Sequence, residues 1–408
     1  MEQTDILISG AGIAGLVAAA GLAQRGFRVC IVDPAPPVDD VAQAGSDLRS
    51  TAYLRPAQAL LARLGLWDAL KPEAQPLAAL QVIDTHGTPP VERARRMFSP
   101  SDVESELFGW NLPNWRCRAI LATHLASLPG VDLRLGVGFV SMLTRDAGAR
   151  VVLSDGTSIA ARLVIGADGR ASSVRQAAGI GVRVRRYGQK ALSFAAAHDL
   201  PHEDVSSEIY NSGGAFTTVP LADHQGEPAS AIVWMQDGPR ALDLAGMARD
   251  DGARFDAEMS ARAVHLLGDM RRITPVQVWP VVTQTADRMI ARRVALIAEA
   301  AHVLPPIGAQ GLNTSLQDVA ALLDRLEDDP GAPAGLERYS ADRLRDVAAR
   351  ASAIDLFNRV CQSDLAAVQA LRLAGLRAVH DMAPLRKQVM QAGMGRDVPG
   401  VLPDAPRS

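Results

Sequence analysis

The sequence predicts an α/β protein with an antiparallel second layer and a helical C-terminal segment. Three observations support this fold class. Residues 5–33 read as strand, glycine turn, helix and second strand; the chain after about Gly181 contains longer strand patterns, among them residues 208–221, separated by polar loops; and residues 336–392 are rich in Ala, Leu and Arg. Because one hydrophobic core stops growing near roughly 250 to 300 residues, a chain of 408 residues predicts about two domains.

The composition is that of an ordinary globular protein, with 48% hydrophobic residues, 21% charged residues and a formal net charge of -3. A nucleic-acid binder would usually show a clustered basic excess, so no nucleic-acid partner is expected. The three cysteines, Cys30, Cys117 and Cys361, lie far apart without a C-x-x-C pair. This spacing favours neither a disulfide framework nor a zinc site, and no metal site is predicted.

The N-terminus enters a strand pattern at once, which leaves no room for the charged and apolar regions of a signal peptide. No uninterrupted apolar stretch approaches the roughly 18 residues of a membrane-spanning helix. We therefore expect a cytoplasmic protein in which any membrane contact is peripheral.

Further elements are predicted between these landmarks. Residues 54–70 have the pattern of an amphipathic helix that ends near Gly65, and residues 77–96 resemble a hairpin with His86 and Gly87 in its turn. The chain therefore alternates between two layers. The predicted segments are 1–76, 98–182 and 286–332 for a discontinuous nucleotide-binding domain, 77–97 and 183–285 for the antiparallel substrate layer, 333–394 for C-terminal helices, and 395–408 for a poorly ordered tail.

The first motif is the glycine pattern of Gly10, Gly12 and Gly15, placed between a strand and a helix. Glycine allows a tight turn through which backbone N–H groups and the helix N-terminus can approach a pyrophosphate. Asp33 ends the next strand, at the distance suited to a carboxylate that binds a ribose. The pattern predicts dinucleotide binding, with a purely structural glycine turn as the alternative.

The second motif is Asp168 and Gly169, at the end of an apolar strand. Taken alone, this pair is an ordinary turn signal. Its place before a helix capped by Ser172 or Ser173 favours a loop that faces a ligand.

The third motif is the segment "ALIAEAAHVLPPIGAQGLN", residues 295–313. It sets Glu299 in an apolar run, where a buried carboxylate needs a helix N-terminus or ligand hydroxyls as partner. The glycines that follow precede a helix whose N-terminus would stabilise negative charge. The alternative is a capped helix with a Gly/Pro entry, and for His302 we favour a structural role over a catalytic one.

Together "GAGIAG", "GADGR" and "EAAHVLPPIGAQGLN" resemble the group A flavoprotein monooxygenases, which have the fold of para-hydroxybenzoate hydroxylase. The resemblance is closer to the hydroxylases of ubiquinone biosynthesis and extends over nearly the whole chain, through "FGWNLPNW", "YGQKALSF" and "DLFNRVCQSDLAAVQALRLAGL". It implies a Rossmann-like FAD-binding domain of the glutathione-reductase type beneath an antiparallel substrate domain.

The resemblance also implies which residues hold FAD. The glycine loop would bind the pyrophosphate, Asp33 the adenosine ribose and Glu299 the ribityl chain, while Asp168 would serve both FAD and the reduced nicotinamide. The full set of cofactor-binding residues that it implies is Gly10, Gly12, Ile13, Ala14, Gly15, Asp33, Arg49, Arg118, Asp168, Glu299, Pro306, Gly308, Gly311, Leu312 and Asn313, with Pro305 beside Pro306 at the flavin face.

The sequence departs from the family pattern at two positions. Asp33 stands where the family usually has Glu, which shortens the reach of the carboxylate. Ala298 replaces the usual glycine before the acidic residue, and its methyl group would crowd the ribityl chain, because glycine at such a point often permits close backbone approach.

The implied activity is hydroxylation of the aromatic ring of a polyprenyl-phenol, in which NAD(P)H reduces the flavin and O2 forms a flavin C4a-hydroperoxide. No side chain need act as nucleophile, so no catalytic residue is assigned. A prenyl tail implies transient contact with a membrane surface or with a complex of ubiquinone biosynthesis. The alternatives are a flavoenzyme of the same fold that acts on another phenol and a non-catalytic FAD-binding subunit; the oligomeric state, the ring position and the choice between NADH and NADPH stay open.

Overall fold

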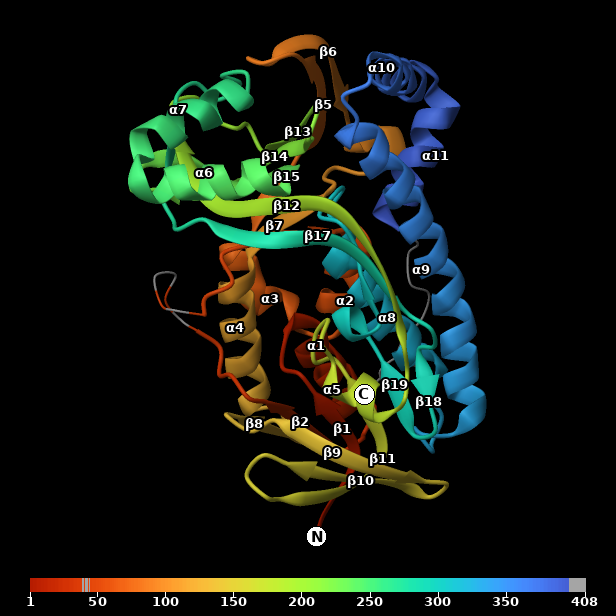
Figure 1. Ribbon diagram of the computed structural model, residues 1–408. Coiled ribbons are helices and arrows are strands. Elements are labelled where there is room, and N and C mark those ends of the chain that lie inside the picture. The colour runs from red at the N-terminus through yellow and green to blue at the C-terminus, as the bar shows by residue number, and fades with distance from the viewer. Residues whose placement is uncertain (39, 41–42, 44, 396–408) are drawn as a thin grey trace.

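The computed structural model describes residues 1–38, 40, 43 and 45–395. The predicted poorly ordered tail lies, from residue 396 onward, outside the described residues. Two large sheets are stacked, the N-terminal one at the bottom of Figure 1 and the second near the top, and helix α9 (Pro333–Gln362) runs along the side of both (Figure 1). The predicted α/β class is confirmed.

The first βαβ unit has the predicted form. Strand β1 (Glu2–Ser9) leads through the glycine turn to helix α1 (Ile13–Gln24) and then to the parallel strand β2 (Val29–Asp33). The consecutive residues Ile6, Leu7 and Ile8 are fully buried, which is typical of a parallel strand covered on both faces. The glycine turn follows the carboxyl end of this central strand, which is where α/β proteins bind ligands.

The N-terminal sheet has eight strands. Six follow the order β18-β19-β11-β1-β2-β8, while β10 pairs with β11 and β9 pairs with β10. Its other strands are β8 (Val131–Leu135), β9 (Phe139–Arg145), β10 (Gly148–Leu153), β11 (Ser158–Gly166), β18 (Ile290–Ala291) and β19 (Val294–Leu296). A small third sheet contains β3 (Ser50–Leu54), β7 (Gly109–Pro113) and β4 (Gln75–Leu77).

The upper sheet has nine strands and is mostly antiparallel, as predicted, but β13 pairs with β5 in parallel. Its strands are β5 (Ala79–His86), β6 (Val91–Phe98), β12 (Val182–His198), β13 (Val205–Asn211), β14 (Gly214–His224), β15 (Glu227–Asp237), β16 (Met270–Arg272), β17 (Gln277–Ala286) and β20 (His302–Val303). The predicted hairpin of residues 77–96 is confirmed as β5 and β6.

One prediction for the upper sheet is wrong. The segment 208–221 was expected to form one long strand, whereas the structure folds it into the hairpin of β13 and β14. The reason is the pair Gly213 and Gly214, whose φ angles of 90° and 144° turn the chain between the two strands.

The helices follow the predicted positions with two additions, α6 and α7. They are α2 (Arg55–Arg63), α3 (Trp67–Leu70), α4 (Asn114–Ala126), α5 (Ser173–Ala177), α6 (Gly238–Asp250), α7 (Gly252–Arg262), α8 (Gln310–Arg325), α9, α10 (Ala366–Asp381) and α11 (Ala383–Met394), with 3-10 turns at Lys71–Glu73, Pro100–Val103 and Ala298–Ala300 (η3). Among the described residues, no helix is both long and apolar enough to cross a bilayer.

Helices α6 and α7 were not predicted. They cover the outer face of the upper sheet, where Leu244 and Phe255 pack with Trp234 (Figure 1). Each helix begins at an aspartate, Asp237 or Asp251, whose side chain accepts a hydrogen bond from a backbone N–H in the first turn. These N-caps were the sequence signal that would have revealed the two helices.

Helix α9 contacts both sheets. Near its start the Tyr339 hydroxyl donates to the carbonyl of Leu296 in the lower sheet at 2.7 Å. Near its end Asn358 donates to the side chain of Gln189 at 2.9 Å, and Gln362 donates to the carbonyl of Tyr187 at 3.1 Å, both in the upper sheet. The division into domains drawn from the sequence stays a prediction.

Candidate functional site

The glycine turn after β1 is shaped by close backbone packing. A Cβ atom on Gly10 would lie 2.3 Å from the Ala167 carbonyl oxygen, and one on Gly15 would lie 2.0 Å from the Gly10 carbonyl oxygen. A Cβ on Gly12, in contrast, would meet nothing within 4 Å. Gly10 and Gly15 therefore let the chain turn tightly, while Gly12 leaves open space at the start of α1.

The N-terminus of α1 has no side-chain cap. Gly12 occupies the capping position, and no acidic residue lies in the first turn. Free N–H groups at the positive end of a 12-residue helix form a ready site for a phosphate group. Ile13 and Ala14 follow in the first turn, and Ala14 is buried.

Asp33 ends β2 beside this turn. Its carboxylate accepts hydrogen bonds from the backbone N–H of Ala11 at 2.7 Å and of Ala35 at 2.9 Å. The Arg118 guanidinium lies 3.2 Å from the same carboxylate and donates to the Ala11 carbonyl at 2.9 Å. The structure thus brings together Asp33 and Arg118, two residues that lie far apart in the sequence, at the edge of the glycine turn.

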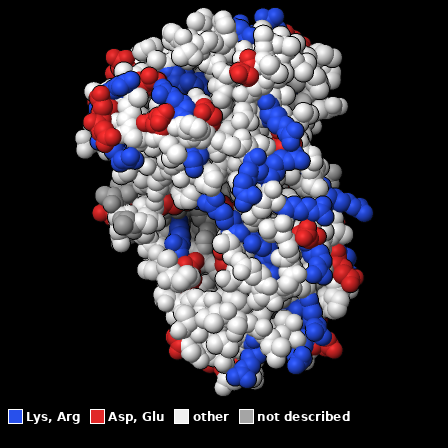
Figure 2. Space-filling view, viewed as in Figure 1, with Lys and Arg blue, Asp and Glu red and all other residues white. Residues whose placement is uncertain are grey.

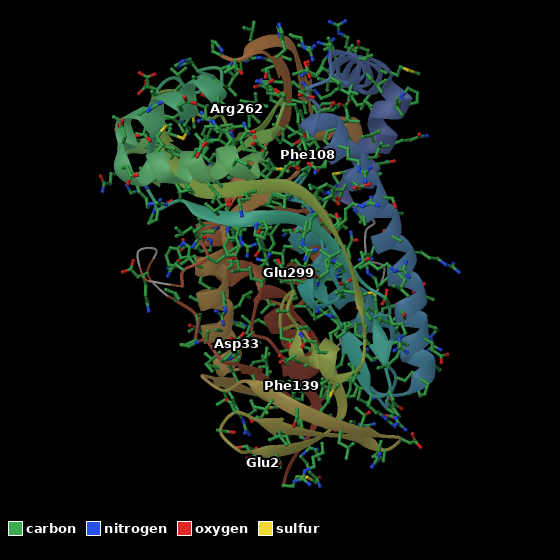
Figure 3. The ribbon with its side chains drawn as sticks, in the orientation of Figure 1. Glu2, Asp33, Phe108, Phe139, Arg262 and Glu299 are labelled. Carbon is green, nitrogen blue, oxygen red and sulfur yellow. The ribbon has the colours of Figure 1, made fainter. Side chains whose placement is uncertain are left out.

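Figure 2 shows a hollow below the upper sheet, with acidic and basic side chains at its rim. Figure 3 labels Asp33 and Glu299 in the same region, with Glu299 nearer the upper sheet. In this view Asp33 lies lower and Glu299 higher on the molecule.

Glu299 lies in the turn η3, directly after β19, and its environment differs from the expected one. Its side chain is 46% exposed rather than buried, and its carboxylate lies 4.0 Å from the Arg49 guanidinium. Arg49 itself pairs with Asp47 at 2.7 Å and stacks over the Trp279 ring at 4.7 Å. Burial lowers the pKa of Arg49, but the hydrogen bonds and charges of Asp47 and Glu299 outweigh it and raise the pKa above its usual value. Arg49 and Trp279 thus form a cationic and aromatic surface beside the Glu299 carboxylate, whose exposed part can accept hydrogen bonds.

The turn η3 is fixed from below by a buried carboxylate that the sequence reasoning missed. Asp318, on α8, accepts hydrogen bonds from the Ala298 N–H at 2.9 Å, from His302 at 2.6 Å and from Arg343 at 2.7 Å. Burial alone would raise the pKa of Asp318, but His302 and Arg343 outweigh it and hold the pKa below its usual range. His302 is thus a structural histidine, as expected.

The loop before α8 has the bare backbone that its sequence predicts. Gly308 has a φ of 61°, the N-terminus of α8 carries no side-chain cap, and a Cβ on Gly311 would meet nothing within 4 Å. Leu312 packs against the core, Pro305 is buried and Pro306 is exposed. Exposed glycine backbone at an uncapped helix start suits contact with a polar ring edge.

Two side chains hold this loop in place. Asn313 donates to the carbonyls of Ala52 and Ala309, each at 2.7 Å, and accepts from the Leu54 N–H at 3.0 Å. Its side chain is therefore occupied by the protein backbone. From the upper sheet, the buried carboxyl group of Glu208 accepts from the Gly308 N–H at 3.2 Å.

Glu208 also accepts a hydrogen bond from the Tyr210 hydroxyl. Burial raises the pKa of Glu208, and the two hydrogen bonds offset this only in part. Sequence reasoning missed Glu208, because a lone glutamate in the alternating pattern of β13 gives no signal that it faces a loop 100 residues away.

Asp168 lies beside the glycine turn, where a Cβ on Gly10 would come within 2.8 Å of its backbone nitrogen, and its side chain has structural partners. Its carboxylate accepts from the Ser172 hydroxyl and from the Val174 N–H, the latter at 3.1 Å. The Ser172 side chain in turn caps α5, as one of the two predicted capping residues. Asp168 thereby orders the short helix after β11.

Residues 3–353 match the family model described as FAD binding domain. The chain belongs to this FAD-binding family. It is 34% identical, over 97% of its length and 90% of the relative's, to a protein of Rhodospirillum rubrum named ubiquinone hydroxylase UbiL. It is 29% identical, over 97% and 99%, to the 3-demethoxyubiquinol 3-hydroxylase of Escherichia coli. The chain is thus an FAD-dependent monooxygenase.

Solved structures agree with this fold. The monooxygenase superimposes with a TM-score of 0.78 on p-nitrophenol 4-monooxygenase PnpA of Pseudomonas putida, at 18% identity and over 97% of this chain and 100% of that one. A TM-score of 0.75 relates it to a variant of Klebsiella pneumoniae HpxO complexed with FAD, again at 18% identity and over 96% and 99% of the chains.

The residues on this face fit FAD. Gly12 leaves space for a ligand, the N-termini of α1 and α8 carry no side-chain caps, and the Glu299 carboxylate is half exposed. These features supply donors for phosphate oxygens and an acceptor for hydroxyl groups. FAD contains both kinds of group, since its pyrophosphate accepts hydrogen bonds and its sugar and ribityl hydroxyls donate them.

Proposed function

We propose that this monooxygenase hydroxylates the aromatic ring of a polyprenyl-phenol intermediate of ubiquinone biosynthesis, with NAD(P)H as electron donor and O2 as oxygen source. The names of two relatives over nearly the full chain support this pathway. The observation that carries the proposal is the inner face of the upper sheet. There the buried side chains of Tyr210, Met235 and Val281 pack with Ile307 of the loop before α8, so the layer beneath which a ring substrate would lie is apolar beside that loop.

We propose further that FAD spans the two uncapped helix ends. In this arrangement the Gly12 turn binds the pyrophosphate, Asp33 accepts the ribose hydroxyls with the lone pairs that the Ala11 and Ala35 N–H groups leave free, and Glu299 accepts the ribityl hydroxyls. The N–H groups of Gly311 and Leu312 would face the pyrimidine edge of the ring. Support comes from the open space at Gly12 and Gly311 and from the exposure of Glu299.

The bound flavin supplies the oxidation chemistry, and the protein supplies binding, orientation and the exclusion of water. Arg49 and Trp279 present a flat cationic and aromatic surface next to Glu299. Glu208 holds the loop of Gly308 against the upper sheet. This hydrogen bond would keep the loop that faces the flavin edge in place against the substrate layer.

The purified protein loaded with FAD tests the function. Addition of a 2-polyprenylphenol of the ubiquinone pathway should stimulate NADPH or NADH oxidation, and mass analysis should find one added oxygen atom in the product. A protein that binds FAD but is stimulated only by other phenols would support an alternative substrate. If the protein binds FAD but no phenol stimulates the oxidation of NADPH or NADH, the alternative of a non-catalytic FAD-binding subunit replaces this proposal.

The prenyl tail of such a substrate would bring the enzyme transiently to a membrane surface or to other proteins of the pathway. Mass analysis of quinone intermediates in cells that lack this chain would identify the ring position. Accumulation of no ubiquinone precursor would count against a role in the pathway.

Replacement of Glu299 by Ala should weaken FAD retention about fivefold to thirtyfold, the equivalent of roughly 1 to 2 kcal/mol, because hydrogen bonds to a charged group would be lost. The measurement is flavin occupancy after dialysis, read from visible absorbance. Glu258→Ala, on the outer helix α7, is the matched control and should keep its flavin. Unchanged occupancy in Glu299→Ala would remove the ribityl role.

Ala298 has a φ of 56°, in the left-handed region that favours glycine. Replacement by Gly removes a strain of roughly 1 to 2 kcal/mol but adds backbone entropy to the unfolded chain, so the stability should change by less than about 1 kcal/mol. FAD affinity should stay equal or become tighter, as titration of the apoprotein with FAD can measure. Clearly weaker binding would show that the methyl group does not crowd the cofactor.

A further inference from the structure

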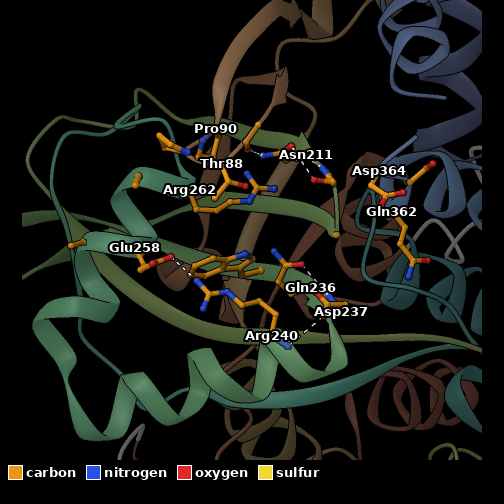
Figure 4. Close-up of a pocket in the computed structure, with 18 of the residues that line it drawn as sticks. Thr88, Pro90, Asn211, Gln236, Asp237, Arg240, Glu258, Arg262, Gln362 and Asp364 are labelled. Atoms are coloured by element: carbon orange, nitrogen blue, oxygen red, sulfur yellow. Dashed lines mark hydrogen bonds and ion pairs between the residues drawn. The ribbon is translucent and has the colours of Figure 1, made fainter. Parts of the chain in front are cut away.

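A cavity of about 1100 Å³ lies on the outer side of the upper sheet. Its walls are the turn between β5 and β6, helices α6 and α7, and the end of α9 (Figure 4). None of the residues predicted to bind FAD lines it. Its volume is that of a site for a small organic ligand.

The cavity is separated from the flavin face by the thickness of the sheet. Successive residues of β15 point to opposite faces: Trp234 packs outward with Phe255 of α7, and Met235 packs inward with Ile307. Trp234 lines the cavity and Met235 does not. A ligand in the cavity would therefore leave the flavin and ring-substrate positions free.

The decisive residue is Arg262, at the end of α7, whose side chain is 6% exposed. One guanidinium nitrogen donates to the carbonyls of Ile209 and Gly214, each at 2.9 Å. The other two, Nε and Nη1, have no hydrogen-bond partner. Arg262 forms no ion pair with any carboxylate among the described residues. Burial, followed by repulsion from Arg372, lowers its pKa to about 9.

Trp234, which lines the same cavity, carries a second unpartnered donor. The indole N–H of Trp234 is buried without an acceptor. Unpaired buried donors each cost roughly 1 to 3 kcal/mol, and a buried cation without a counter-charge costs more. Two residues from different elements that line one cavity thus each carry an unpartnered donor, and a negatively charged acceptor would satisfy both.

The acidic residues around the cavity do not supply it. Glu258 pairs with Arg240 at 2.8 Å, and Asp237 accepts from the backbone of α6. Asp364 is exposed at the opposite side. Figure 4 shows Arg262 on one side of the cavity and Arg240, Gln236 and Asp237 on the other.

We propose that this cavity is a second ligand site of the enzyme, which takes a small organic anion whose carboxylate or phosphate group binds between Arg262 and Trp234. Because both hydrogens of Arg262 Nη2 are used by backbone carbonyls, the oxyanion would accept a charge-assisted hydrogen bond from Nε or Nη1 and a second hydrogen bond from the Trp234 indole N–H. The apolar remainder of the ligand lies against Pro89, Pro90 and Ala261, which also line the cavity.

The test is calorimetric titration of the FAD-loaded protein with hexanoate, butyl phosphate and the neutral hexanamide at constant ionic strength. We expect one or both anions to bind and hexanamide to bind at least about tenfold more weakly, since it lacks the charge. Binding of hexanoate alone assigns a carboxylate ligand, and binding of butyl phosphate alone assigns a phosphate ester. The visible flavin spectrum should not change, which separates this site from the flavin face and from the hydroxylase proposal.

Arg262→Gln should weaken anion binding at least about tenfold. Because Arg262 also supports β13 and β14, Trp234→Phe provides a second variant that keeps an aromatic ring at this position and removes the indole N–H together with part of the ring volume; it should weaken binding about threefold to tenfold. Arg249→Gln, exposed on α6 and outside the cavity, is the control and should bind as the wild type does. Equal affinities in all variants, equal binding of hexanamide, or no binding of either anion would overturn the proposal.

Discussion

Replacement of Asp318 by Asn should lower the free energy of unfolding by about 3 to 5 kcal/mol, the usual cost of breaking a buried ion pair by removing one partner. The carboxylate is fully buried and joins Arg343, His302 and the backbone of Ala298. An amide cannot balance the charge of Arg343, and it replaces one acceptor oxygen by a donor. The measurement is urea unfolding followed by circular dichroism.

The same variant should lose FAD more readily, because the Ala298 N–H that Asp318 holds belongs to the turn that carries Glu299. Flavin occupancy after dialysis reports this second effect. Asp324→Asn is the matched control on the same helix: its side chain is 37% exposed and pairs with Arg325, so its loss should cost less than about 1 kcal/mol. Equal stabilities of the two variants would show that the buried network contributes little.

The Asp318 carboxylate also makes the stability of the folded protein depend on pH. Because its pKa is lowered in the folded protein, its contribution to stability is present above the ordinary pKa of an aspartate and is lost as the pH falls through the folded value. The stability difference between wild type and Asp318→Asn should therefore shrink in acid. A difference that stays constant down to the lowered pKa would contradict the assigned direction.

Replacement of Glu208 by Gln should have an effect of the opposite sign on pH dependence. Burial raises the pKa of Glu208 in the folded protein, so the folded state keeps a proton that the unfolded state has already lost. Stability then falls as the pH rises from the ordinary pKa of a glutamate to the raised one, by up to about 1.4 kcal/mol per pH unit. Glu208→Gln should remove this slope, as urea midpoints measured at a series of pH values would show.

Glu208 also ties the loop of Gly308 to the upper sheet. The glutamine variant keeps the length of the side chain, so it should fold while altering the position of the loop and the substrate-stimulated oxidation of NADPH. Glu227→Gln, on the exposed end of β15 where Glu227 pairs with Arg271, is the control and should keep the wild-type slope. If both variants keep the slope, Glu208 does not titrate in the window that its burial predicts.

The sequence was sufficient to predict the βαβ unit, the β5–β6 hairpin and the C-terminal helices, because their periodicity and turn residues are local signals. It also located the two glycine-containing turns that precede the uncapped helices α1 and α8. Glu299 was placed correctly after a strand but was wrongly expected to be buried, since an apolar neighbourhood in sequence does not show which way a side chain points.

The residues that sequence reasoning missed act through distant partners. Asp318 reads as one polar position of an amphipathic helix, and its role depends on Arg343, which lies 25 residues later. Arg262 lies in a segment for which no helix was predicted, and only the tertiary structure shows that it is buried in the wall of a cavity that Trp234 also lines. Such roles follow from contacts between elements, which periodicity does not encode.

The length of α9 has a consequence for how a substrate enters. Its 30 residues form a continuous helix of about 45 Å, joined to the lower sheet through Tyr339 and to the upper sheet through Asn358. A hinge that separates the two sheets would have to break this helix or the contacts at one of its ends. Helix α9 therefore resists separation of the two sheets, and the connecting loops are the parts of the chain that can move to admit an aromatic substrate.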